Sequence, residues 1–532
     1  MQYFNFHRGD LHLFGKKHLD LVYNQPLFSS LINQPFSIDA FANQMEQKSQ
    51  NFSIEKRNVL VEALTNQYNT ISNNERALKL ISSLQNENTF TVTTGHQLSL
   101  FTGPLFFVIK ILQTIKQAEV LNAKYPDRRF VPVYWMATED HDFEEIQKAN
   151  LFSDELIWDS TQKGPVGRFE LDGLDEVKNR ISELYQNHPE SEIHELIKAY
   201  DGNNLAEATR NLVHFLFSDF DLLIVDGDDA LLKKAFAPIM KQELEKSFSF
   251  DAVSKTNAEL EELGGKIQIH AREINLFYIE KGLRSRIEQK GEDYFIDGKG
   301  HFKKDTMLNL LEERPECFSP NVVLRPLYQE SILPNLVYIG GGGEIAYWLQ
   351  LKGVFDAAGI IYPLIVVRNS MLFIDNGTAK KIEKNDLKLA DVFESADVLK
   401  RNYVEANAGE ELDFSDLDNA LLNLGEKVTT QITSVDPAME QFAAAEVVRL
   451  DKQIESIKDK LVKRSKAKHD GAMKQIEQIK DRLFPNGKLQ ERTSNFFSFC
   501  PDGKFRNRLK EFYDAIDPNE KDFIVMVENE SL

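Results

Sequence analysis

The feature that most constrains this chain is a succession of strand, glycine turn, helix and strand within residues 89–145. A β-branched run, TFTVTT, breaks at GHQ (95–97), and a long segment with apolar residues at helical spacing follows a second turn, TGP (102–104). The chain then reads FVPVYWMA, which is typical of a buried strand, and continues into EDHD (139–142). Two strands joined by a helix form a βαβ unit with a right-handed crossover, which predicts a parallel sheet.

Polar residues directly follow both strands of this unit, as GHQ and as EDHD. The carboxyl ends of parallel strands meet at one edge of the sheet, and open α/β sheets bind their ligands there. We therefore expect these two segments to form the floor of an active site.

A second acidic turn follows the predicted strand 222–225, before a predicted helix at 230–248. The carboxylates of this turn either belong to a ligand site or cap the helix by accepting its free N–H groups. We favour the cap for Asp228 or Asp229.

Residues 319–370 return to the parallel pattern, with predicted strands at 321–324, 335–339 and 360–367. Four glycines and a glutamate, GGGGE (340–344), lie between the second of these strands and a predicted helix. Open backbone N–H groups at such a turn suit a phosphate or a carboxylate. The alternative is a tight turn that lets helix and strand pack closely, because the run lacks the Gly-Lys-Ser/Thr ending of a P-loop and the GxGxxG spacing.

A chain of 532 residues is long enough for two or three domains. We expect an α/β protein with a Rossmann-like parallel core. The predicted parts are a helical layer at 1–88, the core at 89–400 with a mixed insertion at 151–215 and a β insertion at 264–303, a helical coiled coil at 401–485, and a segment at 486–532 that packs back on the core.

The coiled coil is predicted from apolar residues spaced alternately three and four apart, namely Val447, Leu450, Ile454, Ile457 and Leu461. Such a seam needs a partner helix. The sequence leaves open whether the partner is a segment of the same chain, such as 412–435, or a second subunit.

The composition excludes several classes of protein. A formal charge of −20 argues against broad neutralisation of nucleic-acid phosphates. Two cysteines without metal-ligand spacing fit a reducing cytoplasm, and there is no signal-peptide pattern and no apolar run that could span a bilayer. We expect a cytoplasmic protein with neither nucleic-acid nor membrane partners.

The runs TGHQLSLFTGP, VPVYWMATEDHDFEEI, SPNVVLRPLYQESILPNLVYIGGGGEIAYWLQLK and LFPNGKLQER together resemble the bacillithiol biosynthesis cysteine-adding enzymes, the BshC family, over residues 1–532. The resemblance implies a core related to class I nucleotidyl transferases and a coiled coil used in dimerisation. It also implies a ligase that adds L-cysteine to glucosaminyl-malate in the last step of bacillithiol biosynthesis.

Amide formation needs an activated acyl group, so we expect ATP, with Mg²⁺ as its counter-ion and without a protein-bound metal. The resemblance to class I adenylate-forming folds, in which a histidine-containing turn after the first strand contacts the phosphates, implies this role for His96. Asp140 is expected to attract an ammonium group and His141 to take its proton. Arg325 and Arg368 suit the two carboxylates of malate, although either could instead close a structural ion pair. The substrate- or nucleotide-binding candidates are Gly95, Gln97, Thr102, Gly103, Glu139, Asp142, Arg325, Gln329, Gly341, Gly342, Gly343, Glu344, Tyr347 and Arg368.

Two other functions remain open at this point. One is a nucleotide-dependent ligase or nucleotidyl transferase that acts on another amino acid or amino sugar. The other is a coiled-coil scaffold whose Rossmann-like part binds a nucleotide without catalysis. Polar clusters after two adjacent strands favour an enzyme.

Overall fold

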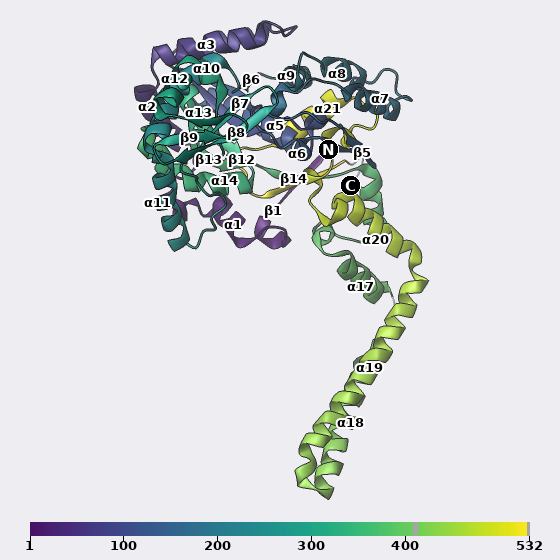
Figure 1. Cartoon of the computed structure of the whole chain (residues 1–532). Coiled ribbons are helices and arrows are strands. Elements are labelled where there is room, and N and C mark those ends of the chain that lie inside the picture. The colour runs from purple at the N-terminus through teal and green to yellow at the C-terminus, as the bar shows by residue number, and fades with distance from the viewer. Residues whose placement is uncertain (408–412, 529–532) are drawn as a thin grey trace. The chain divides into compact units, whose positions relative to one another are not determined.

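The computed structural model describes residues 1–407 and 413–528 (Figure 1). The chain divides into two units. One comprises residues 3–372 and 491–525, and the other comprises residues 1–2, 373–490 and the chain from 526 onward. None of the helices in the described residues is long and apolar enough to cross a membrane.

The larger unit is built on a five-stranded sheet in which all neighbouring strands are parallel. In spatial order its strands are β13 (Leu364–Val367), β12 (Asn335–Gly340), β2 (Thr89–His96), β3 (Arg129–Met136) and β6 (Leu223–Asp226). The chain starts in the centre at β2, builds outward through β3 and β6, and then crosses to the other side for β12 and β13. This is the Rossmann-like arrangement that the sequence predicts, and its topological switch point lies between β2 and β12, where such sheets bind ligands.

The threonines of the central strand explain how a partly polar sequence can be buried there. Thr91 and Thr93 donate to the side-chain oxygen of Asn335 on β12, at 3.2 and 2.7 Å. Thr94 donates to the carbonyl of Ile339 at 2.8 Å. Because each hydroxyl has a partner on the neighbouring strand, its burial carries no penalty for an unmade hydrogen bond.

Helices surround this sheet, and a small hairpin and helices form the insertion after β3 (Figure 1). The N-terminal helices are α1 (Lys16–Tyr23), α2 (Ala40–Asn51), α3 (Ile54–Tyr68) and α4 (Glu75–Ser83), and the crossover from β2 to β3 is α5 (Phe106–Lys124). After β3 come α6 (Phe143–Ile146), β4 (Lys148–Leu151), β5 (Asp154–Ile157), α7 (Leu174–Leu184), α8 (Ile193–Ala199) and α9 (Leu205–Leu216). After β6 come α10 (Ala230–Lys246) and α11 (Phe248–Glu262); α12 (Lys304–Glu313), α13 (Arg325–Ile332), α14 (Gly342–Trp348), α15 (Lys352–Ala358) and α21 (Phe505–Ala515) complete this unit.

The alternating pattern predicted for 264–303 forms an antiparallel sheet that begins at residue 276. Its strands in spatial order are β10 (Gly300–Phe302), β9 (Asp293–Ile296), β8 (Leu283–Lys290), β7 (Leu276–Glu280) and β11 (Phe318–Pro320). A third sheet has the order β1 (Gln2–Phe6), β15 (Phe523–Val527) and β14 (Ser370–Ile374).

The prediction of a strand at residues 321–324 is wrong. The strand is β11, three residues earlier, and it pairs antiparallel with β7. Asn321 instead begins a turn into α13, since its side chain accepts from Val323 N at 2.9 Å and its carbonyl accepts from Arg325 N. A short apolar run can form either a strand or the turn that precedes a helix. Pro326, in the first turn of α13, is the residue that indicates a helix start here.

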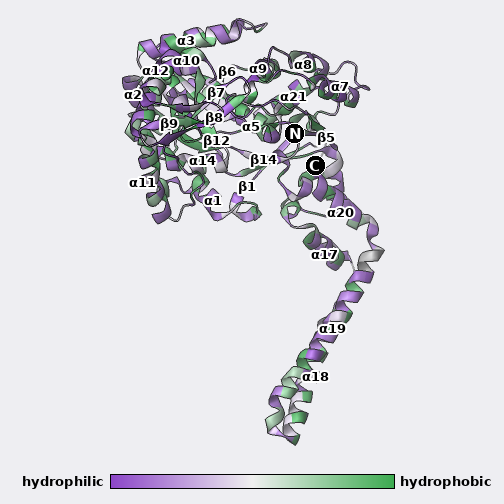
Figure 2. Cartoon of the chain, viewed as in Figure 1, coloured by the Kyte–Doolittle hydropathy of each residue, from purple (hydrophilic) through white to green (hydrophobic). Residues whose placement is uncertain are grey.

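The smaller unit contains the helical hairpin that the heptad pattern predicts. Its helices are α16 (Asn376–Lys384), α17 (Ala396–Asn407), α18 (Ser415–Val435), α19 (Glu440–Lys468) and α20 (Asp470–Leu483). Figure 2 shows hydrophobic and hydrophilic residues interspersed along α18 and α19.

Helix α18 supplies a partner for the seam within the same chain. Gly425 of α18 faces Val447, whose methyl carbon lies 3.1 Å from where a Cβ at position 425 would stand, and Lys458 forms an ion pair with Asp418. Near that pair on α19, the side chains of Ile457 and Leu461 remain 47 % and 45 % exposed. The candidate partner segment 412–435 is therefore confirmed from Phe414 onward; Leu412 lies outside the described residues.

Candidate active site

The carboxyl edge of the parallel sheet brings GHQ and EDHD together. His96 is the last residue of β2 and lies opposite Met136 at the end of β3. The amide nitrogen of Gln97 donates to Asp140 Oδ2 and to Glu145 Oε2, at 2.9 Å each. The two segments, which are more than forty residues apart, are thus joined by one side chain.

His96 is a neutral, half-buried imidazole in a cationic setting. Burial, the charge of Lys110 and, more weakly, that of Arg368 lower the pKa of His96 to about 3, with Glu344 acting in the opposite direction. Its Nε2 atom is buried and has no hydrogen-bond partner among the described residues. A ring of this kind can donate or accept a hydrogen bond at neutral pH, but it does not carry charge.

Lys110 of α5 is a site residue that the sequence analysis missed. Its ammonium, 1 % exposed, donates to the carbonyl of Gly95 at 2.5 Å and to Glu344 Oε2 at 2.7 Å. The same carboxylate oxygen accepts from the N–H of Gly341 at 2.7 Å. One buried lysine therefore links the end of β2 to the start of α14, which follows β12, at the topological switch point. Its only sequence signal was a charge within an otherwise apolar helical stretch.

The two glycine segments have different surroundings. The GHQ segment is separated from α5, which begins at Phe106 after the TGP turn, as the sequence predicts. The GGGGE segment does open α14, but Glu344 folds back over the start of that helix, and Gly342 packs against His18. The glycine tract thus also serves close packing, the alternative reading of that sequence.

Gly342 and Gly343 allow this packing role to be tested. A Cβ at position 342 would lie 2.3 Å from His18 Nδ1, whereas a Cβ at 343 would meet nothing within 4 Å. We predict that Gly342→Ala lowers the melting temperature by several degrees, while Gly343→Ala leaves it unchanged or raises it slightly. Thermal unfolding followed by circular dichroism checks this. Equal melting temperatures for the two variants would contradict it.

Thr102 and Gly103 are buried beneath the C-terminal segment. The amide of Asn495 donates to the carbonyls of Phe101 and Gly103, at 2.7 and 2.8 Å, and Thr102 is 2 % exposed. Gly103 has a φ of +63°, and a Cβ there would lie 2.5 Å from that of Ser99, so the turn requires glycine. These two residues shape the chain between GHQ and α5.

The two arginines predicted to bind carboxylates have different surroundings. Arg368 makes a buried bidentate ion pair with Glu491, at 2.7 and 3.0 Å, so the structural alternative holds for it. Arg325 donates to the buried Gln329 at 3.2 Å and lies beside Tyr347. Arg325 therefore has no carboxylate within ion-pair distance among the described residues.

A buried ion network supports EDHD from behind. Lys233 of α10 lies 2.8 Å from Glu139 and 2.6 Å from Asp228, and Arg168 makes a bidentate pair with Asp228 at 2.6 and 2.8 Å. Burial would lower the pKa of Lys233, but the two carboxylates raise it above its usual value, so this lysine stays charged. The carboxylate of Glu139 thus already pairs with Lys233 and is not free to bind the ammonium group of a ligand.

The acidic turn after β6 is partly a helix cap. Asp229 accepts from Leu231 N and Leu232 N at 2.9 and 3.1 Å, which confirms the cap there. The cap is wrong for Asp228, which belongs to the ion network with Lys233 and Arg168. Asp142 caps α6 by accepting from Glu145 N at 3.2 Å.

Asp140 is half-buried, and His141 beside it is exposed. Burial acts to raise the pKa of Asp140, but hydrogen bonds from Gln97 and from the backbone N–H groups of His141 and Asp142 hold it below its usual value. The His141 side chain is 56 % exposed, and its Nδ1 lies 2.8 Å from Nη1 of Arg284. Arg284, from the β insertion, is a second site residue that is absent from the candidates of the sequence analysis.

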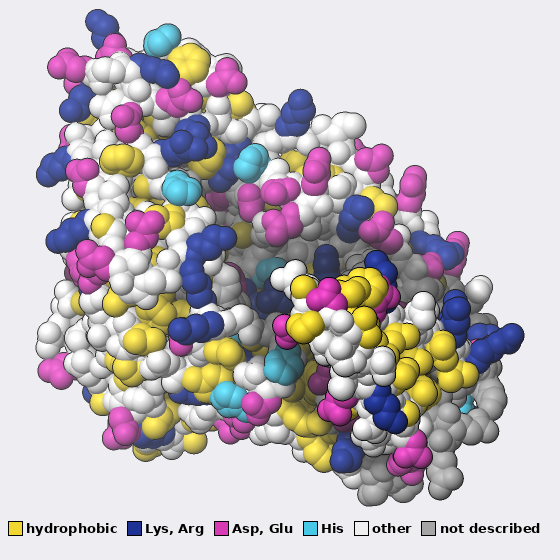
Figure 3. Space-filling view, turned by 90° about the horizontal axis from the view of Figure 1, so that it is seen from below, with side chains coloured by type: hydrophobic (Ala, Val, Ile, Leu, Met, Phe, Trp, Pro, Cys, Tyr) yellow, Lys and Arg dark blue, Asp and Glu magenta, His cyan; other side chains and the backbone are white. Residues whose placement is uncertain are grey.

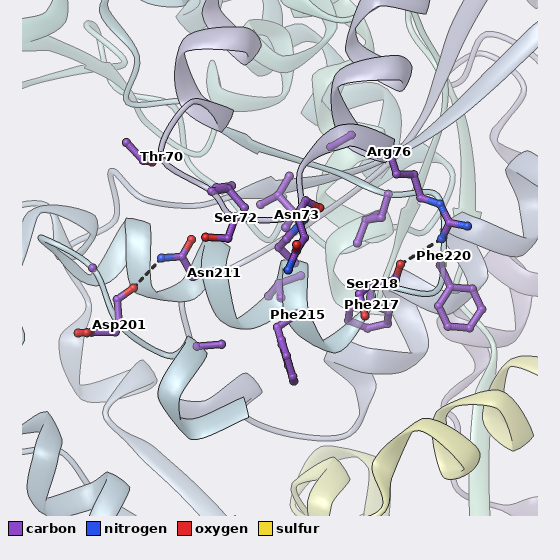
Figure 4. A pocket seen from close by; sticks show the side chains of 18 of the residues that line it. Thr70, Ser72, Asn73, Arg76, Asp201, Asn211, Phe215, Phe217, Ser218 and Phe220 are labelled. Carbon is purple, nitrogen blue, oxygen red and sulfur yellow. Dashed lines mark hydrogen bonds between the residues drawn. The ribbon is translucent and has the colours of Figure 1, made fainter. Parts of the chain in front are cut away.

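A separate cavity of about 400 Å³ lies beside β6, away from these residues (Figure 4). Arg76 donates to the carbonyl of Ser218 there, and Asn211 donates to the carbonyl of Asp201. None of the candidate site residues lines it. Within the described residues, no group of three or more His, Cys, Asp or Glu side chains is arranged to hold a metal ion.

Comparison with known proteins covers both units. Residues 16–369 match the family model "Bacillithiol biosynthesis BshC, N-terminal Rossmann-like domain", and residues 371–528 match the model of its C-terminal coiled-coil domain. Proteins named "Putative cysteine ligase BshC" are similar over most of their length. The protein from Flavobacterium johnsoniae is 41 % identical over 91 % of this chain and 92 % of its own, that from Flavobacterium psychrophilum 40 % over 91 % and 92 %, and that from Cytophaga hutchinsonii 38 % over 87 % and 87 %. With a Rossmann-like core and a coiled coil matched in order along one chain, this protein belongs to the BshC family of bacillithiol biosynthesis.

Proposed function

We propose that this protein is a ligase that joins L-cysteine to glucosaminyl-malate through an amide bond, in the last step of bacillithiol biosynthesis. The observation that carries the proposal is the match of both domains to one family, whose similar members bear the name of a cysteine ligase. The site chemistry is compatible with it, because charged and neutral polar groups meet at the switch point of the sheet.

The residues suggest how an amine and an acyl group are held. Asp140, kept ionised by its hydrogen bonds, suits an ammonium group before the amine loses its proton. Arg325, free of a carboxylate partner within the described residues, suits a carboxylate of the malate portion. His96, with its unpartnered Nε2, suits an oxygen of the substrate.

Activation of the acyl group is the step for which we include ATP, with Mg²⁺ as its counter-ion, since a free carboxylate does not acylate an amine at a useful rate. The glycine turn is not a ready phosphate cradle in this conformation, because the N–H of Gly341 already binds Glu344. We therefore assign no residue to the phosphates and derive no step through them.

Mass spectrometry of a reconstituted reaction tests the proposal. Purified protein with cysteine, glucosaminyl-malate and ATP–Mg²⁺ should yield the thiol product, and a parallel reaction without ATP should not. A product in both reactions would remove ATP from the proposal. A product in neither, from a folded protein, would remove the ligase assignment.

We further propose that the enzyme acts in the cytoplasm as a homodimer joined through the helical hairpin. Its two buried cysteines are unpaired, which supports a reducing compartment. Large apolar side chains remain exposed on the hairpin and the turn that joins its helices, and Figure 3 shows hydrophobic side chains grouped there; they include Leu422, Val435, Met439, Phe442 and Val448. Large apolar side chains exposed together on one hairpin favour a protein partner.

Charge introduced on this surface should separate the subunits. We predict that Val435→Asp combined with Phe442→Asp halves the mass measured by light scattering without loss of helicity, because these side chains are 77 % and 49 % exposed within one chain. Ser434→Asp, at an exposed polar neighbour, is the control. A wild-type protein with the mass of one chain would refute the dimer.

A further inference from the structure

The β insertion places one arginine directly on the histidine of EDHD. Arg284, on β8, stacks with its guanidinium carbon 3.7 Å from the centre of the Phe277 ring on β7. Its Nη1 lies 2.8 Å from Nδ1 of His141. Its Nε atom is buried and lacks a partner among the residues the structure describes. The arginine is thus held in place by packing and points one end at the imidazole.

This contact determines which ring nitrogen of His141 carries the proton. A guanidinium has N–H donors and no acceptor, so Nδ1 must offer its lone pair. A neutral imidazole then carries its proton on Nε2. Protonation of Nδ1 would remove the acceptor and place two cations in contact.

The opposite tautomer would need Asp140 as its acceptor. Asp140 Oδ1 lies 3.4 Å from His141 Nδ1, a longer contact than that to Arg284. The same oxygen already accepts from the backbone N–H of His141 at 2.7 Å. Glu139 and Asp142, the remaining acidic neighbours in EDHD, are engaged with Lys233 and the start of α6.

We propose that His141 acts as a neutral hydrogen-bond donor through Nε2–H, with Arg284 as the positioning residue that fixes this tautomer. The inference rests on the proposed ligase function and gives His141 a role other than the general base expected from the sequence. As the amine nitrogen bonds to the acyl carbon, the carbonyl electron pair moves to oxygen, and Nε2–H donates to that oxygen. The pair then returns and expels the activating group, while the amine proton passes to water. Neutral donors aimed at such an oxygen are an established source of rate acceleration.

Two substitutions at His141 separate a donor from a base. Glutamine keeps an N–H donor but cannot take a proton, whereas alanine keeps neither. We expect His141→Gln to retain turnover within about tenfold of the wild type and His141→Ala to lose about a hundredfold to a thousandfold. Equal losses in both variants would overturn the donor role.

Nitrogen-15 NMR of histidine-labelled enzyme tests the tautomer without any substrate. The resonances of His141, assigned by their loss in His141→Gln, should report a protonated Nε2 and an unprotonated Nδ1. Arg284→Met should release this preference, and Arg284→Lys, which still donates, should restore it. Arg286→Met, at an exposed arginine two residues along the same strand, is the matched control and should change nothing.

The outcomes distinguish this inference from the proposed function. A protonated Nδ1 in the wild-type enzyme, or a tautomer that Arg284→Met leaves unchanged, overturns the inference even if the thiol product forms. A correct tautomer in a wild-type enzyme that makes no product supports the role of Arg284 and counts against the ligase assignment alone.

Discussion

Replacing Lys110 with Met is expected to lower the free energy of unfolding by about 1–3 kcal/mol, because it leaves a buried carbonyl and a carboxylate that is only 30 % exposed without their donor. Methionine fills nearly the same volume but leaves the carbonyl of Gly95 and the carboxylate of Glu344 without their cation. Because these groups lie at the end of β2 and at the start of α14, beside the proposed site, most of the turnover should be lost as well. Urea unfolding and the product assay measure the two effects.

Lys124→Met is the matched control on the same helix. Lys124 pairs with Asp39 at the surface, where solvent screens the charges, so the same substitution should have little effect on stability or turnover. If Lys110→Met were as stable and as active as this control, the contacts of Lys110 with Gly95 and Glu344 would be dispensable. Lys110→Arg, which keeps the charge but not the fit, should fall between the two.

Replacing Arg368 with Met is expected to cost more, about 3–5 kcal/mol, because it leaves the charge of Glu491 fully buried and without its cation. Glu491 is 1 % exposed and also accepts from Ser370 Oγ at 2.7 Å and from Met371 N at 2.9 Å. Arg368→Met combined with Glu491→Met should cost much less than the sum of the single changes. Arg129→Met, which breaks a half-exposed pair with Asp221, should cost at most about 1 kcal/mol.

The pH dependence of stability gives the same pair a second test. Burial alone would raise the pKa of Glu491, but Arg368 and the hydrogen bonds hold it below its usual value. Its contribution to stability is therefore complete above the unfolded value of about 4.3 and is lost as the pH falls through the folded pKa. In Arg368→Met, burial without compensation reverses the shift, so stability should fall as the pH rises above about 4. Two results would contradict the ion pair: additive stability losses for Arg368→Met and Glu491→Met, or a pH dependence of stability that Arg368→Met leaves unchanged. Either result would mean that Arg368 is free to bind a substrate carboxylate.

The sequence by itself determined the parallel core and the position of its polar edge. Buried parallel strands need continuous apolar or β-branched runs, and these runs are local, as in β2, β3 and β12. The right-handed crossover and the polar residues after each strand then place GHQ and EDHD at one edge, where Gln97 joins them. The heptad spacing likewise predicted a helix that needs a partner, because that periodicity is a property of one segment.

Only the tertiary structure decided which charged side chains meet. Arg368 pairs with Glu491 across 123 residues, Lys110 with Glu344 across 234, and Arg284 reaches His141 across 143. Nothing local marks such partners, since a buried charge takes whichever opposite charge or acceptor the packing of distant elements brings within hydrogen-bond distance, and leaving it unpaired is too costly. For this reason Arg368, predicted to bind a substrate carboxylate, forms an ion pair within the protein, and Arg284 of the β insertion contacts His141.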